Sequence, residues 1–368
     1  MPRTSSNSRE SRFARAVLTQ NLQVKPGENV IIEGWSHSLP WASALAREAR
    51  RLKAYPIVLY EDEDSYWDSI AAKEDKVLGA APSHEWAAIG KTDVYIHMWG
   101  AGDKLRFNSL PAARVGKLFA WNPEWYKAAA KAGLRGSRLE VGRPFPSLAK
   151  VYGVDESKWM DRLVAATLVN PETLEAAGTP IARALERGRR LRIRDKHGTD
   201  LTLGLAHRKA QGEYGRITKA ALKRPFGMLN MLPAGVVRVA LDESVGDGTI
   251  VANRTSYNDT GRATGGVFEF RKGRLVRHHY DTGGSELFDK PFRAAGKGKD
   301  RPGYLAIGLN PGLHNTPQME DREAGAITVS VGQNAFLPAG KNKADFTGIV
   351  VNAGATVEVD GKPLRLPG

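Results

Sequence analysis

Hydrophobic and polar residues follow different patterns in the two halves of the chain. In the first half, short apolar runs typical of buried strands are followed by segments whose apolar residues keep helical spacing. Strands are expected at 29–34, 56–60, 93–99 and 117–121, and helices at 12–22, 39–53, 64–78 and 123–132. Strands that alternate with helices predict a parallel sheet, so this half is expected to be an α/β domain.

The pattern changes after two further expected helices, at 155–168 and 171–187. Asn170 is suited to cap the second helix, with Pro171 at its first position. Beyond residue 190 the apolar runs are short, and two pairs of them face each other across hairpin-like turns at 195–200 and 271–273. The expected strands of this half are 191–194, 201–205, 267–270, 274–276, 327–331 and 356–359. We therefore predict an α/β protein with two domains: an N-terminal α/β domain with a parallel sheet (1–188) and a C-terminal β-rich α+β domain (189–368).

Composition narrows the chemistry. The sequence contains no cysteine, which excludes disulfides, thiolate nucleophiles and cysteine-based metal sites. No Gly-x-Gly-x-x-Gly follows the first strand, so a nucleotide-binding Rossmann domain is not expected. No run of about 18 apolar residues and no apolar signal segment is present, which predicts a cytoplasmic protein with no membrane partner.

The formal net charge of +14 raises the question of a nucleic-acid partner. The basic residues are dispersed, and the densest run, 187–194, alternates Arg with Leu191 and Ile193 as a strand with one solvated face would. Aromatic residues do not interleave with the basic ones. The charge therefore favours a small anionic substrate over nucleic acid.

The order of short motifs in the second half is informative. They are Leu232-Pro-Ala-Gly-Val-Val, Gly246-Asp-Gly-Thr-Ile-Val-Ala, Phe268-Glu-Phe-Arg-Lys-Gly-Arg-Leu-Val, Gly332-Gln-Asn and Val357-Glu-Val-Asp-Gly. This order resembles the metallopeptidase family of aminopeptidase T and aminopeptidase S. The same fold houses 2,5-dihydroxypyridine 5,6-dioxygenase, an iron enzyme that opens a hydroxylated pyridine ring. The resemblance implies a homodimer and a metal centre in the C-terminal half.

Peptidases of this family hold two metal ions with Glu, His and Asp side chains. At the positions that the resemblance aligns with these ligands, the chain has Val236, Ala306 and Thr328, and the final His-x-Asp-Phe reads Lys343-Ala-Asp345-Phe. Of these residues only Asp345 can bind a metal as an anion. The sequence therefore lacks the residues of a full two-metal centre.

A single non-haem iron needs fewer ligands, two His and one carboxylate on one face. The resemblance places His279 on the first iron His of the dioxygenase and Asp345 on its carboxylate. The second His falls on Lys343, a protonated amine that cannot coordinate, and His314 is the nearby candidate to replace it. The expected cofactor is one divalent metal, iron or zinc, or none. Alternatively, His279 ends a strand with a solvated ring, and His314 and Asp345 are surface residues.

A third interpretation takes the substitutions at face value. Lys343 would act as a catalytic or anion-binding amine in a metal-free pocket, with Glu213 and Tyr214 as catalytic carboxylate and phenol. His207 and Arg216 flank the same loop and are the candidate substrate-binding residues. The alternative is that Glu213 and Tyr214 cap a turn.

Three functions remain open on the sequence. The leading hypothesis is an enzyme that acts on a small polar or anionic molecule, similar to a non-haem iron ring-cleaving dioxygenase with an altered metal shell. The second is a metal-dependent aminopeptidase or amidase. The third is a metal-free enzyme or a catalytically inactive binding or scaffold protein of the aminopeptidase fold.

Overall fold

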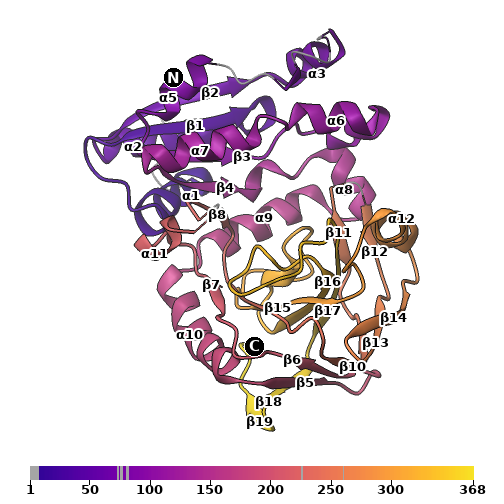
Figure 1. Cartoon of the computed structure of the whole chain (residues 1–368). Coiled ribbons are helices and arrows are strands. Elements are labelled where there is room, and N and C mark those ends of the chain that lie inside the picture. Colours follow the sequence, from indigo (N-terminus) through magenta and orange to yellow (C-terminus); the bar gives the residue numbers. More distant parts are fainter. Residues whose placement is uncertain (1–7, 73, 75–77, 80–82, 225–226, 260) are drawn as a thin grey trace. The chain divides into compact units, whose positions relative to one another are not determined.

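In a computed structural model of the chain, residues 8–72, 74, 78–79, 83–224, 227–259 and 261–368 are described, and they fall into two compact units (Figure 1). Unit 1 comprises residues 1–150, 154–168 and 215–233, and unit 2 comprises 151–153, 169–214 and 234–368. The division differs from the predicted boundary at residue 188. The helix that follows Asn170 groups with unit 2, and the chain returns to unit 1 for residues 215–233.

Unit 1 is built on a five-stranded parallel sheet in the order β2-β1-β3-β4-β8. Its strands are β1 (Asn29–Trp35), β2 (Tyr55–Glu61), β3 (Val94–Met98), β4 (Arg135–Leu139) and β8 (Leu229–Leu232). Its helices are α1 (Arg9–Arg15), η1 (Ala16–Asn21), η2 (Ser36–Ser38), α2 (Leu39–Arg51), α3 (Glu63–Ala72), α5 (Ser83–Ile89), η3 (Lys104–Ser109), α6 (Ala112–Leu118), α7 (Asn122–Ala132), η4 (Glu140–Gly142), most of α8 (Pro146–Tyr152), α9 (Glu156–Thr167) and α11 (Lys219–Leu222). The predicted helix at 64–78 corresponds to α3, and its residues 73 and 75–77 lie outside the described part of the chain.

Helices cover both faces of this sheet, as a parallel sheet requires. Ile31 and Tyr95 pack with Trp125 and Ala129 of α7 on one face. On the other face α2 comes so close to β1 that a side-chain carbon at Gly34 would lie 3.1 Å from Ala42. The α/β prediction for this half is confirmed.

One predicted strand is wrong and two were missed. Residues 117–121 do not form a strand, because Lys117 and Leu118 end α6 and the chain turns directly into α7. The fourth and fifth strands of the sheet are β4 and β8. Strand β4 reads Arg-Gly-Ser-Arg-Leu, and its buried Ser137 donates a hydrogen bond to Asn230 of β8. Because a polar pair takes the place of apolar contacts, the hydrophobic pattern does not reveal these strands.

Unit 2 is β-rich and antiparallel. A seven-stranded sheet has the order β14-β13-β10-β6-β5-β18-β19, a five-stranded sheet has the order β17-β16-β15-β9-β7, and β11 pairs with β12. The strands are β5 (Arg190–Arg194), β6 (Asp200–Gly204), β7 (Gln211–Glu213), β9 (Val236–Ala240), β10 (Gly246–Val251), β11 (Ser256–Asn258), β12 (Gly261–Ala263), β13 (Val267–Arg271), β14 (Arg274–His279), β15 (Pro302–Gly308), β16 (Ala326–Gly332), β17 (Thr347–Ala353), β18 (Thr356–Val359) and β19 (Lys362–Leu364). The helices are α10 (Pro171–Arg187), η5 (Ser285–Asp289), α12 (Lys290–Ala294) and η6 (Glu320–Arg322).

Local signals in this half are confirmed. Asn170 accepts a hydrogen bond from the Glu172 amide at 2.9 Å, which caps α10 as predicted. The two expected hairpins form as β5–β6 and β13–β14.

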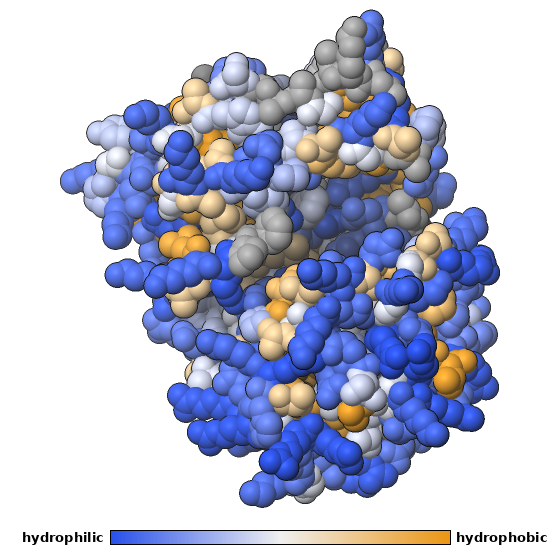
Figure 2. Space-filling view, in the orientation of Figure 1, coloured by the Kyte–Doolittle hydropathy of each residue, from blue (hydrophilic) through white to orange (hydrophobic). Residues whose placement is uncertain are grey.

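The face shown in Figure 2 is mostly hydrophilic with scattered apolar residues, as expected from the high content of charged residues.

Phe288 anchors the aromatic core of unit 2. Its side chain is 1% exposed, and its ring lies 4.5–5.6 Å from five other rings, centre to centre. Those rings belong to Phe268, His278, Tyr280, Phe292 and Phe346. A side-chain carbon at Gly348 would lie 2.2 Å from the ring, so the neighbouring backbone also packs directly on it.

Replacing Phe288 with Ala should lower the free energy of unfolding of unit 2 by about 3–5 kcal/mol, because a large cavity forms among rings that cannot collapse onto it. Hydrogen exchange of β13 and β17 measures this directly. Val276→Ala, at a side chain that is 52% exposed, is the control and should change exchange little. Equal protection in Phe288→Ala and the control would contradict the assignment of this core.

Candidate functional site

The positions that the resemblance aligns with metal ligands lie on one face of the five-stranded sheet of unit 2. Strands β9, β15 and β16 pair so that Arg238 lies opposite Ala306, and Ala306 lies opposite Thr328. Residues opposite one another in antiparallel strands share a face, and Val236 shares it too because it is two residues from Arg238. The side chains of Val236, Ala306 and Thr328 are completely buried.

The guanidinium of Arg238 occupies this face together with two carboxylates. Its Nη1 donates to Glu213 Oε1 at 2.6 Å, and its Nη2 donates to Asp321 Oδ2 at 2.5 Å. Arg322 completes the network, with Nη2 3.2 Å from Glu213 Oε2 and Nη1 2.9 Å from Asp321 Oδ1. Two arginines and two carboxylates therefore form a ring in which each arginine pairs with both carboxylates. The Arg238 side chain is only 12% exposed.

The network fixes its own protonation states. Burial alone would raise the pKa of Glu213 and of Asp321, but Arg238 and Arg322 outweigh burial and hold the pKa of both carboxyls below the usual range. Burial lowers the pKa of Arg238, and the facing Glu213 and Asp321 more than reverse this effect. All of these groups are therefore charged at neutral pH.

Beside the network, Glu320 is in the opposite situation. Its side chain is 3% exposed, Oε1 accepts a hydrogen bond from the Tyr257 amide, and no residue in the described part of the chain hydrogen-bonds to Oε2. Burial raises the pKa of Glu320 to about 8, so the carboxyl is largely protonated at neutral pH. Among the described residues, Arg322 Nε and Thr328 Oγ1 also have no hydrogen-bond partner, and both atoms are buried.

The donor set on this face does not fit the two metals of the peptidase family. Two of the aligned positions carry the hydrocarbon side chains of Val236 and Ala306, which offer no lone pair, and Thr328 offers a neutral hydroxyl. The neighbouring carboxylates Glu213 and Asp321 already neutralise Arg238, a fixed positive charge that would repel a metal ion.

The structure gives each predicted ligand of a single metal a separate partner. His279 is 63% exposed at the end of β14, with Nε2 3.1 Å from Asp281 Oδ1. His314 Nδ1 lies 3.3 Å from Glu323 Oε1, and Asp345 accepts a hydrogen bond from the Gly296 amide at 3.1 Å. Across the described residues, no group of three or more His, Asp or Glu side chains is arranged to hold a metal ion. His279, His314 and Asp345 are not brought together as a ligand set.

The three predicted catalytic residues lie in different environments. Glu213 belongs to the charge network. The Tyr214 ring lies over Gly178 and Gly212, and burial raises the pKa of its hydroxyl. Lys343 is exposed in the segment between β16 and β17. Their catalytic role stays a prediction.

Of the two predicted substrate-binding residues, Arg216 belongs to unit 1 and donates from Nε to the Gln20 carbonyl at 3.1 Å. His207 lines a pocket of roughly 770 Å³ in unit 2. The other lining residues are Ala206, Arg208, Lys209, Asp242, Glu243, Ser244, Arg301, Ala339 and Lys341. The lining therefore contains four cationic and two anionic side chains in addition to His207.

The backbone around this pocket is strained. Ala206, His207 and Ala339 have φ of 53°, 55° and 62°, a left-handed conformation that costs a residue with a side chain about 1–2 kcal/mol. Glu243 connects the two loops: it pairs with Arg208 at 2.5 Å and accepts the Lys341 amide at 3.1 Å. Burial would raise the pKa of Glu243, but these hydrogen bonds lower it to about 2. Strain held by surrounding contacts is typical of binding sites.

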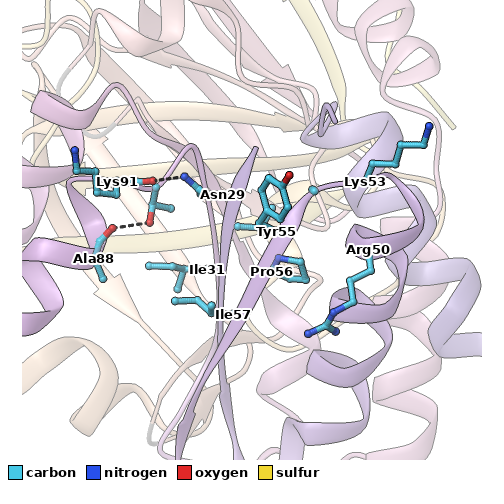
Figure 3. Close-up of a pocket in the computed structure, with 12 residues that line it drawn as sticks. Asn29, Ile31, Arg50, Lys53, Tyr55, Pro56, Ile57, Ala88 and Lys91 are labelled. Carbon is cyan, nitrogen blue, oxygen red and sulfur yellow. Dashed lines mark hydrogen bonds between the residues drawn. The ribbon is translucent and has the colours of Figure 1, made fainter. Parts of the chain in front are cut away.

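A second pocket, of about 700 Å³, lies in unit 1 where β1 and β2 begin (Figure 3). Asn29 Nδ2 donates to the Lys91 carbonyl across it, and the Arg50 and Lys53 side chains flank Tyr55 and Pro56. Parallel sheets bind ligands at the carboxyl ends of their strands, and this pocket lies at the amino ends. We therefore rank it below the pocket around His207.

Sequence reasoning missed Arg238, Asp321 and Glu320. One signal was available, because Arg238 interrupts the apolar run Val236-Val-Arg-Val-Ala on a strand that is buried on both faces. A lone cation at such a position requires a buried anion. The identity of that anion, more than 80 residues later in the chain, cannot be read from the pattern.

Comparison with known proteins identifies the class. The sequence model described as thermophilic metalloprotease (M29) matches residues 6–294, so the chain belongs to this metallopeptidase family. AmpT from Thermus thermophilus has a similar structure, with a TM-score of 0.73 and 20% identity over 98% of both chains. The 2,5-dihydroxypyridine dioxygenase from Pseudomonas putida KT2440 has a TM-score of 0.60 and 17% identity over 99% of this chain and 97% of that one. None of the curated proteins matches significantly.

These comparisons confirm the predicted superfamily and the fold. The matched range ends at residue 294, before the segment that carries Ala306, Thr328 and Asp345. Within the described residues, no helix is long and apolar enough to cross a membrane.

The protonation of Glu320 makes the stability of unit 2 depend on pH. The pKa of Glu320 is about 8 in the folded protein against 4.5 for an ordinary Glu, so the folded state binds the proton more tightly. Its stabilising contribution is fully present below pH 4.5 and is lost as the pH rises to about 8.

Glu320→Gln should remove this dependence, because the amide resembles the neutral carboxyl in shape. Relative to the variant, the wild type should lose up to about 1.4 kcal/mol per pH unit across that window, measured by denaturant unfolding. Glu286→Gln, at a side chain that is 65% exposed, is the matched control. Parallel stability curves for wild type and Glu320→Gln would contradict the assignment.

Proposed function

We propose that this chain is a metal-independent member of the M29 fold whose unit 2 binds a small anionic molecule rather than hydrolysing peptides at a two-metal centre. The observation that carries the proposal is the Arg238 guanidinium on the face of Val236, Ala306 and Thr328. A permanent, non-exchangeable cation is held there by two carboxylates. This corresponds to the third function left open by the sequence.

The pocket around His207 supports the anionic ligand. Arg208 forms an ion pair with Glu243. Asp242 accepts hydrogen bonds from the amide and the hydroxyl of Ser244. The two lysines, Lys209 and Lys341, therefore carry charge that these contacts do not neutralise, and they extend from the two strained loops. Two ammonium groups and an imidazole suit a phosphate or a small dicarboxylate.

Purified protein should contain well under one iron or zinc per chain after growth in supplemented medium, and a chelator should leave its melting temperature unchanged. Elemental analysis and thermal unfolding test this, with release of arylamine from leucyl arylamide as the activity readout. One bound metal per chain, with chelator-sensitive stability or turnover, would overturn the proposal in favour of a one-metal enzyme or a metallopeptidase. His279→Ala and Asp345→Asn would then test those residues as ligands.

Arg238→Met should destabilise unit 2 by about 3–5 kcal/mol at pH 7, because two buried carboxylates lose their shared counter-charge. The loss should be smaller at pH 5, where the carboxylates of the variant take up protons more readily. Urea unfolding at the two pH values measures both effects. Arg192→Met, in an exposed ion pair with Asp200, is the control and should change the stability little.

Inorganic phosphate and succinate are suitable probes of the pocket. Binding measured by calorimetry should weaken in Lys209→Gln and Lys341→Gln and should fall with added salt. Lys196→Gln, at an exposed lysine elsewhere in unit 2, should leave it unchanged. Equal affinities in all three variants would show that the pocket is not the binding site.

A further inference from the structure

A second group of polar side chains lies in unit 1, at the carboxyl ends of β1, β3 and β4. Glu33 of β1 is in register with His97 of β3, and His97 is in register with Arg138 of β4. The three therefore form one row across the sheet. None of them was a candidate on the sequence, and they are independent of the site in unit 2.

The position of this row in the fold favours a ligand. After β1 the chain adds β2 on one side, and it then adds β3 on the other side, so the order β2-β1-β3 reverses between β1 and β3. Open parallel sheets bind ligands in the crevice at the carboxyl ends of the strands where the order reverses. Glu33 and His97 are the pair that flanks this point.

The carboxylate and the imidazole are held in a defined orientation. Glu33 Oε1 lies 3.2 Å from His97 Nδ1, and the Tyr95 hydroxyl donates to Glu33 Oε2. Burial would raise the pKa of Glu33, but His97, Tyr95 and Arg138 keep it below its usual range, so Glu33 is ionised. Glu33 accepts a hydrogen bond from His97 Nδ1–H, so in the neutral form of the ring the lone pair is on Nε2.

His97 Nε2 is available to a small molecule. Within the described part of the chain, no protein group hydrogen-bonds to it, and the side chains of His97 and Glu33 are 22% and 25% exposed. The surroundings are aromatic and carry both signs of charge: Lys104 and Arg143 lie 4.2 and 4.1 Å from the Trp99 ring, and the Glu85 carboxyl interacts electrostatically with Glu33. The His97 ring lies 5.7 Å from the Trp99 ring, and Arg138 donates to the Tyr126 hydroxyl and lies 5.6 Å from the Trp99 ring.

We propose that Glu33, His97 and Arg138 form a second small-molecule site, for a carboxylic acid with an apolar or aromatic body and a weakly acidic O–H group. Arg138 pairs with the carboxylate, and the rings of Trp99 and Tyr126 contact the apolar body. His97 Nε2 accepts the proton of the O–H group, and the oxygen keeps the electron pair. The resulting imidazolium is stabilised by Glu33 through Nδ1–H.

Carbethoxylation by diethyl pyrocarbonate tests the site, because this reagent attacks an imidazole nitrogen that carries a free lone pair. Benzoate is the probe, and mass spectrometry of peptides follows His97 with His84 as the internal reference. Benzoate at ten times its dissociation constant should slow labelling of His97 by about tenfold and leave His84 unchanged. Labelling of His97 that is slow without benzoate, or fast in its presence, would overturn the proposal.

Variants separate anion binding from a purely structural role. Arg138→Gln should abolish protection by benzoate, and Arg138→Lys should restore part of it, because charge is retained without bidentate geometry. Glu33→Gln should slow labelling of His97, because the imidazole loses its anionic hydrogen-bond acceptor. Protection that persists in Arg138→Gln would contradict the role of Arg138. Protection by inorganic phosphate but not by benzoate would overturn the assigned ligand class. None of these outcomes depends on whether unit 2 binds anions or metals.

Discussion

The ion pairs of Arg238 with Glu213 and Asp321 fix the charges on the sheet face of unit 2 that carries Val236, Ala306 and Thr328. A guanidinium cannot be discharged at any physiological pH, so both carboxylates stay ionised and directed at it. Arg322 bridges the same two acids from η6, which fixes this short helix on the sheet. A metal ion would compete with Arg238 for the same carboxylates. Arg238 is part of β9, so its guanidinium stays beside the two carboxylates that it pairs with.

Under the proposed metal-independent function, this arrangement compensates the buried acids on the face where the resemblance places metal ligands. Metal ions commonly cross-link the strands that bear their ligands, and their loss leaves buried anions without compensation. Here Val236 and Ala306 are hydrocarbon and Thr328 is a neutral hydroxyl, and the acids Glu213 and Asp321 are compensated by arginines of the same chain. Glu320 is the exception, because it is buried without a strong cation contact and resolves the conflict by keeping its proton.

The sequence predicted the parts of the fold that follow from local rules. Asn170 capped its helix, and the β5–β6 and β13–β14 hairpins formed where alternating runs flank turn residues. Strand β4 was missed because burial of Ser137 is compensated by Asn230, more than 90 residues away. The two compact units differ from the predicted division for a related reason: residues 215–233 supply β8 to the parallel sheet of unit 1 after the chain has entered unit 2. Such pairings depend on distant partners and leave no periodic signature.

The same distinction applies to function. Motif order led to the right superfamily, because it rests on residues compared one position at a time. Proximity cannot be read in this way, and so His279, His314 and Asp345 seemed a set although each has its own partner. Glu33 and His97 show the converse. They are 64 residues apart and inconspicuous in the sequence, yet parallel register places them side by side where the strand order reverses. In a sheet protein, functional groups are therefore better sought along rows of register than along the chain.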